Sequence, residues 1–508
     1  MGRFSGVLLH PTAFYGRYGC GDLGPDGFKI LDWLHDAGQS VLQVLPLNPT
    51  GFGNSPYSSA SAFAGNHHLI SIDVLIKKGL LTVKDIAGYP LTAPDRVDFG
   101  VLNSVNNDLY RKAFKRFIKS GSKDYNQFKE ENSYWLHNYA LFVSLKKFMD
   151  EKSWNQWDSS YRDYSADIKD LPDQVKEDYE FNSFLQFEFF SQWSSFKSYA
   201  NSLGISVFGD IPIFVSYDSA DVWGDKDRFM LDKDGLPLTV AGVPPDYFSE
   251  TGQLWGNPHY NWSKEESEDF GWWRNRIKHS LRFYDYLRID HFRGFESYWA
   301  VPYGEKTAVN GKWVKSPGMK LFAALKKDLK SELKNRIIAE DLGVITAEVR
   351  ELRDKFGLRG MRVFEFAPFN HGRFSDDDGV THDNSDHPFL PANYDRNSIA
   401  YTGTHDNDTL IGWFNSLSGY NKSCFINYMG ASNLDDLNFS VIKLIMSSDA
   451  YMTVFPLQDI LGLDTDGRFN YPGSLSDLNW SWRLRSDMLT KSFAHKLKKI
   501  TKESGRAR

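Results

Sequence analysis

The sequence of 508 residues contains only two cysteines, Cys20 and Cys424. Two cysteines cannot build a disulfide framework, and no Cys and His residues have the spacing of a structural zinc site. We therefore predict no metal site. Reduced thiols are typical of a reducing compartment, so we expect a cytoplasmic protein.

Long apolar runs are also missing. No stretch approaches the roughly 18 apolar residues that a membrane span needs, and the apolar run near the N-terminus is too short for a secretory signal. The net charge of −6 and the pI near 6.1 argue against nucleic acid or an anionic membrane as a partner. The sequence carries no signal for an oligomeric state.

Aromatic residues, by contrast, are plentiful, with 15 Trp, 25 Tyr and 38 Phe. Most of them are expected in the core of a globular protein, which the hydrophobic content of 41% allows to be large. An excess of rings also suits an enzyme that stacks them against the apolar faces of sugars.

Short β-rich apolar runs recur along the chain with helical segments between them, which predicts parallel strands joined by right-handed crossovers. Eight such runs favour a TIM (β/α)8 barrel over an open doubly wound sheet. The predicted strands lie within residues 4–11, 40–49, 205–214, 284–292, 335–343, 361–369, 398–407 and 450–461.

Two intervals are too long for simple crossovers of a single barrel that spans residues 1–508. Residues 51–203, between the second and third strands, are rich in Lys, Asp, Tyr and Trp at helical spacing and predict a mostly helical insertion subdomain. Residues 215–283 form a second insertion. It contains the Pro-, Gly- and aromatic-rich stretch 241–258, which has no periodicity and predicts an irregular functional lid loop.

The stretch YLRIDHFRGF (286–295) places Arg288 and Asp290 two positions apart in a predicted strand. Strand side chains repeat with period two, so these two groups share one face and Leu287 and Ile289 share the other. The simplest interpretation is an ion pair on a solvated edge strand. In a closed barrel that face can only be the interior or the rim.

Acidic residues end several of the predicted strands, where the active sites of TIM barrels lie. They are Asp210, Asp290, Glu340, Asp341 and Asp406. Paired carboxyl groups at a rim with little water favour glycoside chemistry. Arg288 favours the charged form of Asp290 and so the nucleophile role. Glu340 follows apolar residues, which favours a raised pKa and the acid/base role, and Asp406 beside His405 could bind ring hydroxyls.

Two other motifs suggest different sites. GCGDLG (19–24) fits the dinucleotide pattern G-x-G-x-x-G, but no acidic residue for a ribose ends the next strand. The acidic stretch 375–387 could bind a cation but lacks the residue order of an EF-hand loop. We interpret both as structural segments.

RIDHFRGF (288–295), AEDLG (339–343) and GTHDN (403–407) resemble the signatures of the 4-α-glucanotransferases called amylomaltase or disproportionating enzyme, glycoside hydrolase family 77. Longer stretches are similar to that family in particular, and the resemblance extends from residue 4 to the last predicted helix. These stretches are residues 54–66, 209–223, 241–258 and 456–473.

The resemblance implies a barrel with helical insertions, no cofactor, and maltooligosaccharides and α-1,4-glucans as substrates. It implies Asp290 as nucleophile, Glu340 as acid/base and Asp406 as transition-state stabiliser. The substrate-binding residues implied by the same motifs are Arg288, His405, Tyr57, Asp210, the lid residues Tyr247, Phe248 and Trp255, and Asn470 on the acceptor side.

Two alternative functions stay open at this point. A hydrolytic α-amylase-type enzyme of the same clan would share the barrel acids. A catalytically inactive glucan-binding protein would share the fold, although the presence of all three acids argues against it.

Overall fold

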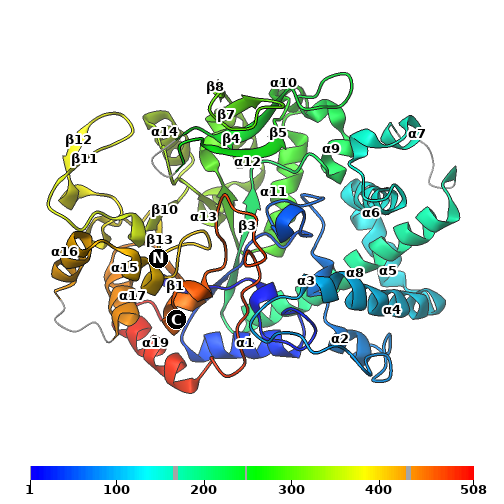
Figure 1. Cartoon of the computed structure of the whole chain (residues 1–508), viewed down its shortest axis with the longest axis horizontal. Coiled ribbons are helices and arrows are strands. Elements are labelled where there is room, and N and C mark those ends of the chain that lie inside the picture. Colours follow the sequence, from blue (N-terminus) through cyan, green and yellow to red (C-terminus); the bar gives the residue numbers. More distant parts are fainter. Residues whose placement is uncertain (1, 164–169, 246–248, 431–435, 508) are drawn as a thin grey trace.

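A computed structural model describes residues 2–163, 170–245, 249–430 and 436–507. Its centre is an eight-stranded parallel sheet in the order β10-β13-β14-β1-β2-β3-β6-β9. A parallel bridge between Ile338 of β9 and Arg359, which precedes β10, brings the two edges together. The predicted TIM barrel is therefore confirmed (Figure 1).

Seven barrel strands lie inside the apolar runs identified in the sequence, and the eighth, β10, begins one residue before its run. The strands are β1 (Phe4–Leu8), β2 (Val41–Gln43), β3 (Ser206–Pro212), β6 (Tyr286–Asp290), β9 (Ile337–Ala339), β10 (Gly360–Val363), β13 (Ser398–Tyr401) and β14 (Met452–Pro456).

The interior of the barrel is filled by one side-chain cluster drawn from most of the strands. It contains Leu8, Val41, Phe208, Ile338, Met361, Val363, Ile399, Tyr401, Met452 and Val454, and Tyr286 packs against it. The alternate residues Val207, Ile211, Leu287 and Ile289 belong to the larger core between strands and helices. Asp210, Arg288 and Asp290 therefore project inward by strand alternation.

Helices cover the outside of the barrel at the crossovers. They are α1 (Pro25–Asp36), α8 (Asp173–Ser202), α11 (Gly271–Phe283), α12 (Gly318–Leu329), α13 (Ser331–Arg336), α14 (Ala347–Lys355), α15 (Leu410–Ser416), α16 (Gly419–Met429), α17 (Leu437–Ser447), α18 (Leu457–Leu461) and α19 (Lys491–Glu503). The crossover from β10 to β13 differs. It contains the antiparallel hairpin β11 (Arg373–Ser375) and β12 (Thr381–Asp383).

Further helices between β2 and β3 group on one side of the barrel, at the right of Figure 1. They are α2 (Ile72–Lys77), α3 (Phe99–Val101), α4 (Asn107–Ser120), α5 (Lys123–Glu131), α6 (Ser133–Phe148) and α7 (Ser159–Arg162). The long helix α8 packs along α6 and leads back into β3. Among the described residues, no helix is long and apolar enough to cross a membrane.

The stretch 241–258 differs from the irregular loop expected from its composition. It contains the end of β4 (Thr239–Val243) and all of β5 (Gln253–Pro258), which pair antiparallel. These strands form a four-stranded sheet with β7 (Ser297–Pro302) and β8 (Lys312–Lys315) in the order β5-β4-β7-β8. The Gly- and Pro-rich sequence hides the alternation that normally marks a strand. Short helices α9 (Ala220–Gly224) and α10 (Trp262–Ser267) flank the β4–β5 pair in the chain.

Gly209 of β3 provides a test of the packing between barrel and helices. A Cβ atom at this position would lie 2.2 Å from the ring of Tyr284. Because both groups are fixed in the core, we expect Gly209→Ala to destabilise the protein by about 1–3 kcal/mol through overpacking. Gly271→Ala, at an open position in the first turn of α11, is the control and should stay within about 0.5 kcal/mol. The denaturant concentration at the unfolding midpoint measures the stability of the two variants. Equal midpoints would contradict the packing argument.

Candidate active site

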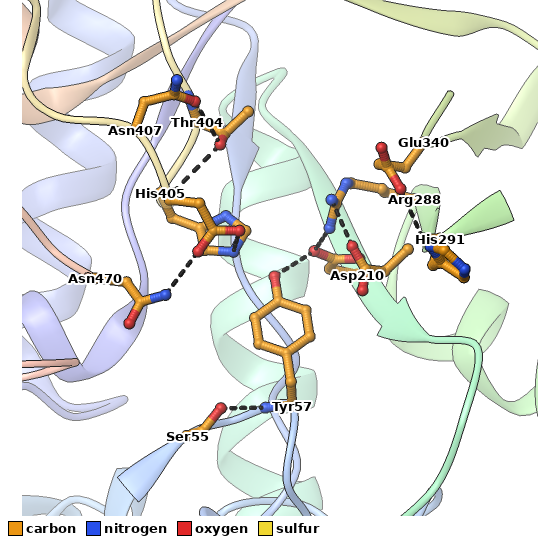
Figure 2. A network of polar contacts seen from close by, with 12 residues as sticks. Ser55, Tyr57, Asp210, Arg288, His291, Glu340, Thr404, His405, Asn407 and Asn470 are labelled. Carbon is orange, nitrogen blue, oxygen red and sulfur yellow. Dashed lines mark hydrogen bonds and ion pairs between the residues drawn. The ribbon is translucent and has the colours of Figure 1, made fainter. Parts of the chain in front are cut away.

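A single guanidinium group joins two carboxylates at the carboxyl end of the barrel. Arg288 Nη1 donates to Asp210 Oδ2 at 2.5 Å, and Arg288 Nη2 donates to Asp290 Oδ1 at 2.7 Å (Figure 2). Arg288 pairs with Asp210 in the strand register of β3 and β6. Arg288 is 5% exposed and Asp210 is 0% exposed, so the cation is held inside the protein by these two partners.

Asp290 is the member of this group that reaches the open rim, because its side chain is 31% exposed. Its surroundings raise its pKa to about 6, chiefly by burial, while the charge of Arg288 acts in the opposite direction. Asp210 and Asp406 add repulsion that raises the same pKa. The arginine therefore limits the rise of this pKa but does not bring it below the ordinary value.

Glu340 directly follows β9, the strand next to β6. Its Oε2 accepts the backbone N–H of His291 at 2.7 Å, and its Oε1 accepts the N–H of Leu342 at 2.8 Å. Burial and then the charge of Asp290 raise the pKa of Glu340 to about 8, against these two hydrogen bonds and the charge of Arg288. Of the two neighbouring carboxyl groups, Glu340 thus keeps its proton to the higher pH.

His291 adopts a left-handed backbone conformation with φ 53°, which ends the strand and turns its N–H toward Glu340. Strand alternation from Leu287 and Ile289 would place it on the outer face of the barrel. Instead it lies at the rim, and its ring contacts Trp255 of β5 edge-on at 4.9 Å between centroids. Trp255 is 40% exposed.

Asp341 does not share the role of its neighbour. Its Oδ1 accepts the N–H of Met361 at 2.6 Å, and its Oδ2 accepts from Arg353 Nη1 at 2.5 Å. Arg353 lies in α14, which follows β9, and Met361 lies in β10, so this carboxylate joins the end of β9 to the next helix and the next strand. The sequence had grouped it with the acids of the rim, but its contacts are structural.

Tyr57 connects the arginine pair to the other side of the site. Its hydroxyl donates to Asp210 Oδ2 at 2.8 Å. Its ring stacks on His405 with 5.3 Å between centroids and an interplanar angle of 11°. Burial lowers the pKa of His405, although Asp406 beside it acts in the opposite direction.

Asp406 lies on the loop that follows β13, with its side chain 47% exposed. Asn470 Nδ2 donates to its Oδ1 at 2.7 Å, and Nε2 of His405 lies 3.4 Å from its Oδ2. Both contacts orient the carboxylate at the rim. The structure thus brings together seven of the predicted residues in one set of polar and ring contacts: Asp210, Arg288, Asp290, Tyr57, His405, Asp406 and Asn470 (Figure 2).

Glu340 joins this set through His291, and Trp255 lies over His291. The two other predicted lid residues, Tyr247 and Phe248, lie outside the described residues.

Two residues of the site were not found from the sequence. Trp480 packs against both Tyr57 and His405, at 5.9 Å and 6.0 Å between ring centroids. Arg468 donates to the carbonyl oxygens of Asp406 and Asn470, each at 2.7 Å. Neither residue lies directly after a barrel strand, so the search for functional residues at the strand ends could not identify them. The segment NYPG (470–473), part of the family-like stretch 456–473, was the one sequence motif that pointed to this loop.

The two motifs that suggested other sites have structural contacts. The N–H of Gly24 in GCGDLG is bonded to Asp22 at 2.7 Å, and a Cβ at Gly24 would lie 2.1 Å from Ser71 Oγ, so packing accounts for this glycine. In the acidic stretch 375–387, Asp377 and Asp378 accept the backbone N–H groups of Ile345 and Ala347. They thereby hold the segment that begins α14.

Comparisons with known proteins agree with one another. A family model described as 4-alpha-glucanotransferase matches residues 9–490. The chain is 46% identical to a 4-alpha-glucanotransferase of Synechocystis sp. over 99% of this chain and 98% of that protein. It is 42% identical to one of Clostridium butyricum over 98% and 100%. The solved structure "Amylomaltase from Streptococcus agalactiae in complex with acarbose" matches with a TM-score of 0.93 and 36% identity over all of both chains.

Because Asp210 and Asp290 share the guanidinium of Arg288, we expect Arg288→Met to lose stability by an amount that depends on pH. Breaking a buried pair costs about 3–5 kcal/mol because it leaves an uncompensated charge. Without Arg288 the pKa of Asp290 rises further above its unfolded value, so the folded state binds more protons and the stability of the variant falls as pH rises. We expect a larger loss at pH 8 than at pH 5, measured by denaturant unfolding.

Arg274→Met is the matched control, because Arg274 also joins two aspartates, Asp269 and Asp328, but its side chain is 25% exposed. A more exposed pair is worth less, about 0–1 kcal/mol. The loss in this control should be similar at pH 5 and pH 8. The same pH dependence in both variants would contradict a specific effect of burial at Arg288.

Proposed function

Because this chain belongs to the 4-alpha-glucanotransferase family, we propose that Asp290, Glu340 and Asp406 carry out the reaction of that family in it. The chain is an enzyme with 4-alpha-glucanotransferase activity. It transfers a segment of an α-1,4-glucan to the 4-hydroxyl of an acceptor glucose or maltooligosaccharide. The observation that supports the residue roles is the different bonding of two carboxyl groups on neighbouring strands. Asp290 accepts from the guanidinium of Arg288 at 2.7 Å, whereas Glu340 accepts the backbone N–H groups of His291 and Leu342 and has its pKa raised by burial and by the charge of Asp290.

In the first step the carboxylate of Asp290 attacks the anomeric carbon of the donor sugar. The bond from that carbon to the glycosidic oxygen breaks, and Glu340 donates its proton to the departing oxygen. The raised pKa of Glu340 keeps this proton in place near neutral pH. The products are a covalent glycosyl-enzyme on Asp290 and a shortened glucan with a free 4-hydroxyl.

In the second step the 4-hydroxyl of the acceptor attacks the same carbon and releases Asp290. Glu340, now a carboxylate, takes the proton of that hydroxyl and returns to its starting form. Two displacements at one carbon retain its α configuration. The partners of Glu340, the N–H groups of His291 and Leu342, keep the group in one position through both steps.

The remaining residues of the site would bind the donor and acceptor sugars. Asp406, oriented by Asn470 and His405, would bind ring hydroxyls as the sugar flattens toward the transition state. Arg288 and Asp210 would set the position and charge of Asp290, and Tyr57 would present its ring edge to the same sugar. Asn470 would lie on the acceptor side.

Transfer exceeds hydrolysis only if water is excluded from the glycosyl-enzyme while a sugar hydroxyl is admitted. Trp255 is suited to this, because its exposed indole contacts the ring of His291, the residue whose backbone N–H bonds to Glu340, and offers a stacking surface at the rim. Tyr247 and Phe248 would complete the lid.

The relative from Streptococcus agalactiae was solved with acarbose, which supports maltooligosaccharides and α-1,4-glucans as the ligands of this chain. We propose one catalytic barrel over residues 1–508 with insertions at about 51–203 and 215–283. The cytoplasmic location stays a prediction, supported by the free state of Cys20 and Cys424.

Incubation with maltotriose alone tests the proposed reaction. A transferase should form glucose together with a ladder of longer maltooligosaccharides, because each glycosyl-enzyme passes its sugar to another maltotriose. Thin-layer or anion-exchange chromatography resolves the products. A hydrolase of the same clan would give only products shorter than maltotriose, and an inactive glucan-binding protein would give none.

The donor α-maltotriosyl fluoride distinguishes the role of Asp290 from that of Glu340, because its leaving group needs no protonation. Glu340→Gln should still be glycosylated by this donor but should transfer slowly, because no base activates the acceptor. Its glycosyl-enzyme should therefore accumulate and be detected by mass spectrometry on the peptide that contains Asp290. In Asp290→Asn no adduct should form. An adduct in Asp290→Asn, or its location on another residue, would remove Asp290 as the nucleophile.

A further inference from the structure

The loop that carries Asp406 extends from Thr402, just after β13, to Leu410, the first residue of α15. Both ends of the loop bond to one carboxylate that is outside it. Asp459 Oδ2 accepts the hydroxyl of Thr402 at 2.5 Å, and Asp459 Oδ1 accepts the backbone N–H of Leu410 at 2.8 Å. A single side chain thus closes the loop by holding its two ends together.

Asp459 lies in α18, which directly follows β14, and it is 0% exposed. Buried carboxylates of this kind are costly unless both oxygens are hydrogen-bonded, and here each oxygen has one partner from the loop. The backbone of α18 is itself held by a side chain of α17. Asn438 Nδ2 donates to the carbonyl oxygens of Asp459 and Ile460 at 3.0 Å and 3.1 Å. The carboxylate therefore projects from a fixed backbone.

Contacts inside the loop transmit this constraint to Asp406. Asn407 Oδ1 accepts both the N–H and the hydroxyl of Thr404, each at 2.9 Å, and Thr404 Oγ1 accepts the N–H of Asp406 at 3.3 Å. Gly403 packs on a neighbouring buried carboxyl, since a Cβ there would lie 2.8 Å from Glu365 Oε1. These contacts leave the loop little freedom once its ends are fixed.

We propose that Asp459 is a positioning residue for transfer: by closing the 402–410 loop it holds the carboxylate of Asp406 where the transition state requires it. The inference rests on the role proposed above for Asp406. Asp459 is 0% exposed, so it acts through the loop that it closes and, within that loop, on the position of Asp406. An error of about 1 Å in a group that stabilises a transition state can cost on the order of 100-fold in rate.

Asp459→Asn tests this with little change in side-chain volume. The asparagine has one accepting oxygen. If that oxygen keeps the N–H of Leu410, the Nδ2 must face Thr402, whose hydroxyl has to turn and accept, so the loop is closed with an altered and weaker pair of hydrogen bonds. We expect kcat for maltotriose disproportionation to fall about 10- to 100-fold while KM changes less than about 3-fold. This split indicates an interaction made mainly in the transition state.

Asp178→Asn is the matched control, because it makes the same substitution at a buried aspartate remote from the site. Asp178 lies in α8, is 4% exposed and accepts from Arg111 and Lys147 of the helical insertion. The melting temperature should fall in both variants, but kcat per folded enzyme should stay within about 3-fold of the parent only in Asp178→Asn. An equal loss of kcat in both variants would assign Asp459 to general stability and overturn the inference.

If Asp459→Asn does not fold, variants of Thr402 test the same contact from the loop side. Thr402→Val removes only the hydroxyl that Asp459 Oδ2 accepts, and it should lower kcat. Thr402→Ser retains the hydroxyl and should recover most of the activity. Parent-like kcat in Thr402→Val together with parent-like kcat in Asp459→Asn would overturn the inference.

Asp406→Asn distinguishes failure of this inference from failure of the proposed function. If Asp406→Asn stays active, the role of Asp406 is wrong and the inference falls with it. If Asp406→Asn is inactive while Asp459→Asn resembles the parent, only the inference is overturned. If both lose activity, the double variant should be little slower than Asp406→Asn, because residues that act through one group are not additive. A further 10-fold loss in the double variant would show that Asp459 acts elsewhere.

Discussion

The buried cation of Arg288 is the constraint around which the site is arranged. Because a guanidinium is always charged and costly to bury, its place inside the barrel requires negative partners. Asp210 and Asp290 provide them from the neighbouring strand and from the same strand. The Tyr57 hydroxyl then bonds to Asp210, and its ring sets the position of His405. One charge in the interior thus organises groups from β3, β6 and two loops.

The same arrangement makes two adjacent carboxyl groups chemically different. Asp290 has a guanidinium that opposes the effect of burial, whereas the direct partners of Glu340 are the uncharged N–H groups of His291 and Leu342. The charge of Asp290 in turn raises the pKa of Glu340. Two acids on neighbouring strands therefore divide into one that ionises first and one that keeps its proton, which is the division a double displacement needs.

A second theme is the use of buried carboxylates to fix the ends of strands and loops. Asp341 joins the end of β9 to Met361 and Arg353, directly beside Glu340. Asp459 joins the two ends of the loop that carries Asp406. In each case a buried acid with structural contacts supports one to which we propose a role in the reaction. Because a buried polar group is costly without hydrogen bonds, these contacts give the loop the rigidity that an active site requires.

Much of this protein could be read from local sequence. Strand periodicity placed Arg288 and Asp290 on one face, and each of the eight apolar runs located one barrel strand to within a residue, because both signals depend on residues close in the chain. The structural contacts of Asp341 could not be read, since they depend on which segments the barrel brings beside the end of β9. The stacking of Trp480, the contacts of Arg468 and the closure of the Asp406 loop by Asp459 bring together segments distant in sequence. Only the closed barrel brings them within contact distance, so only the tertiary structure decides them.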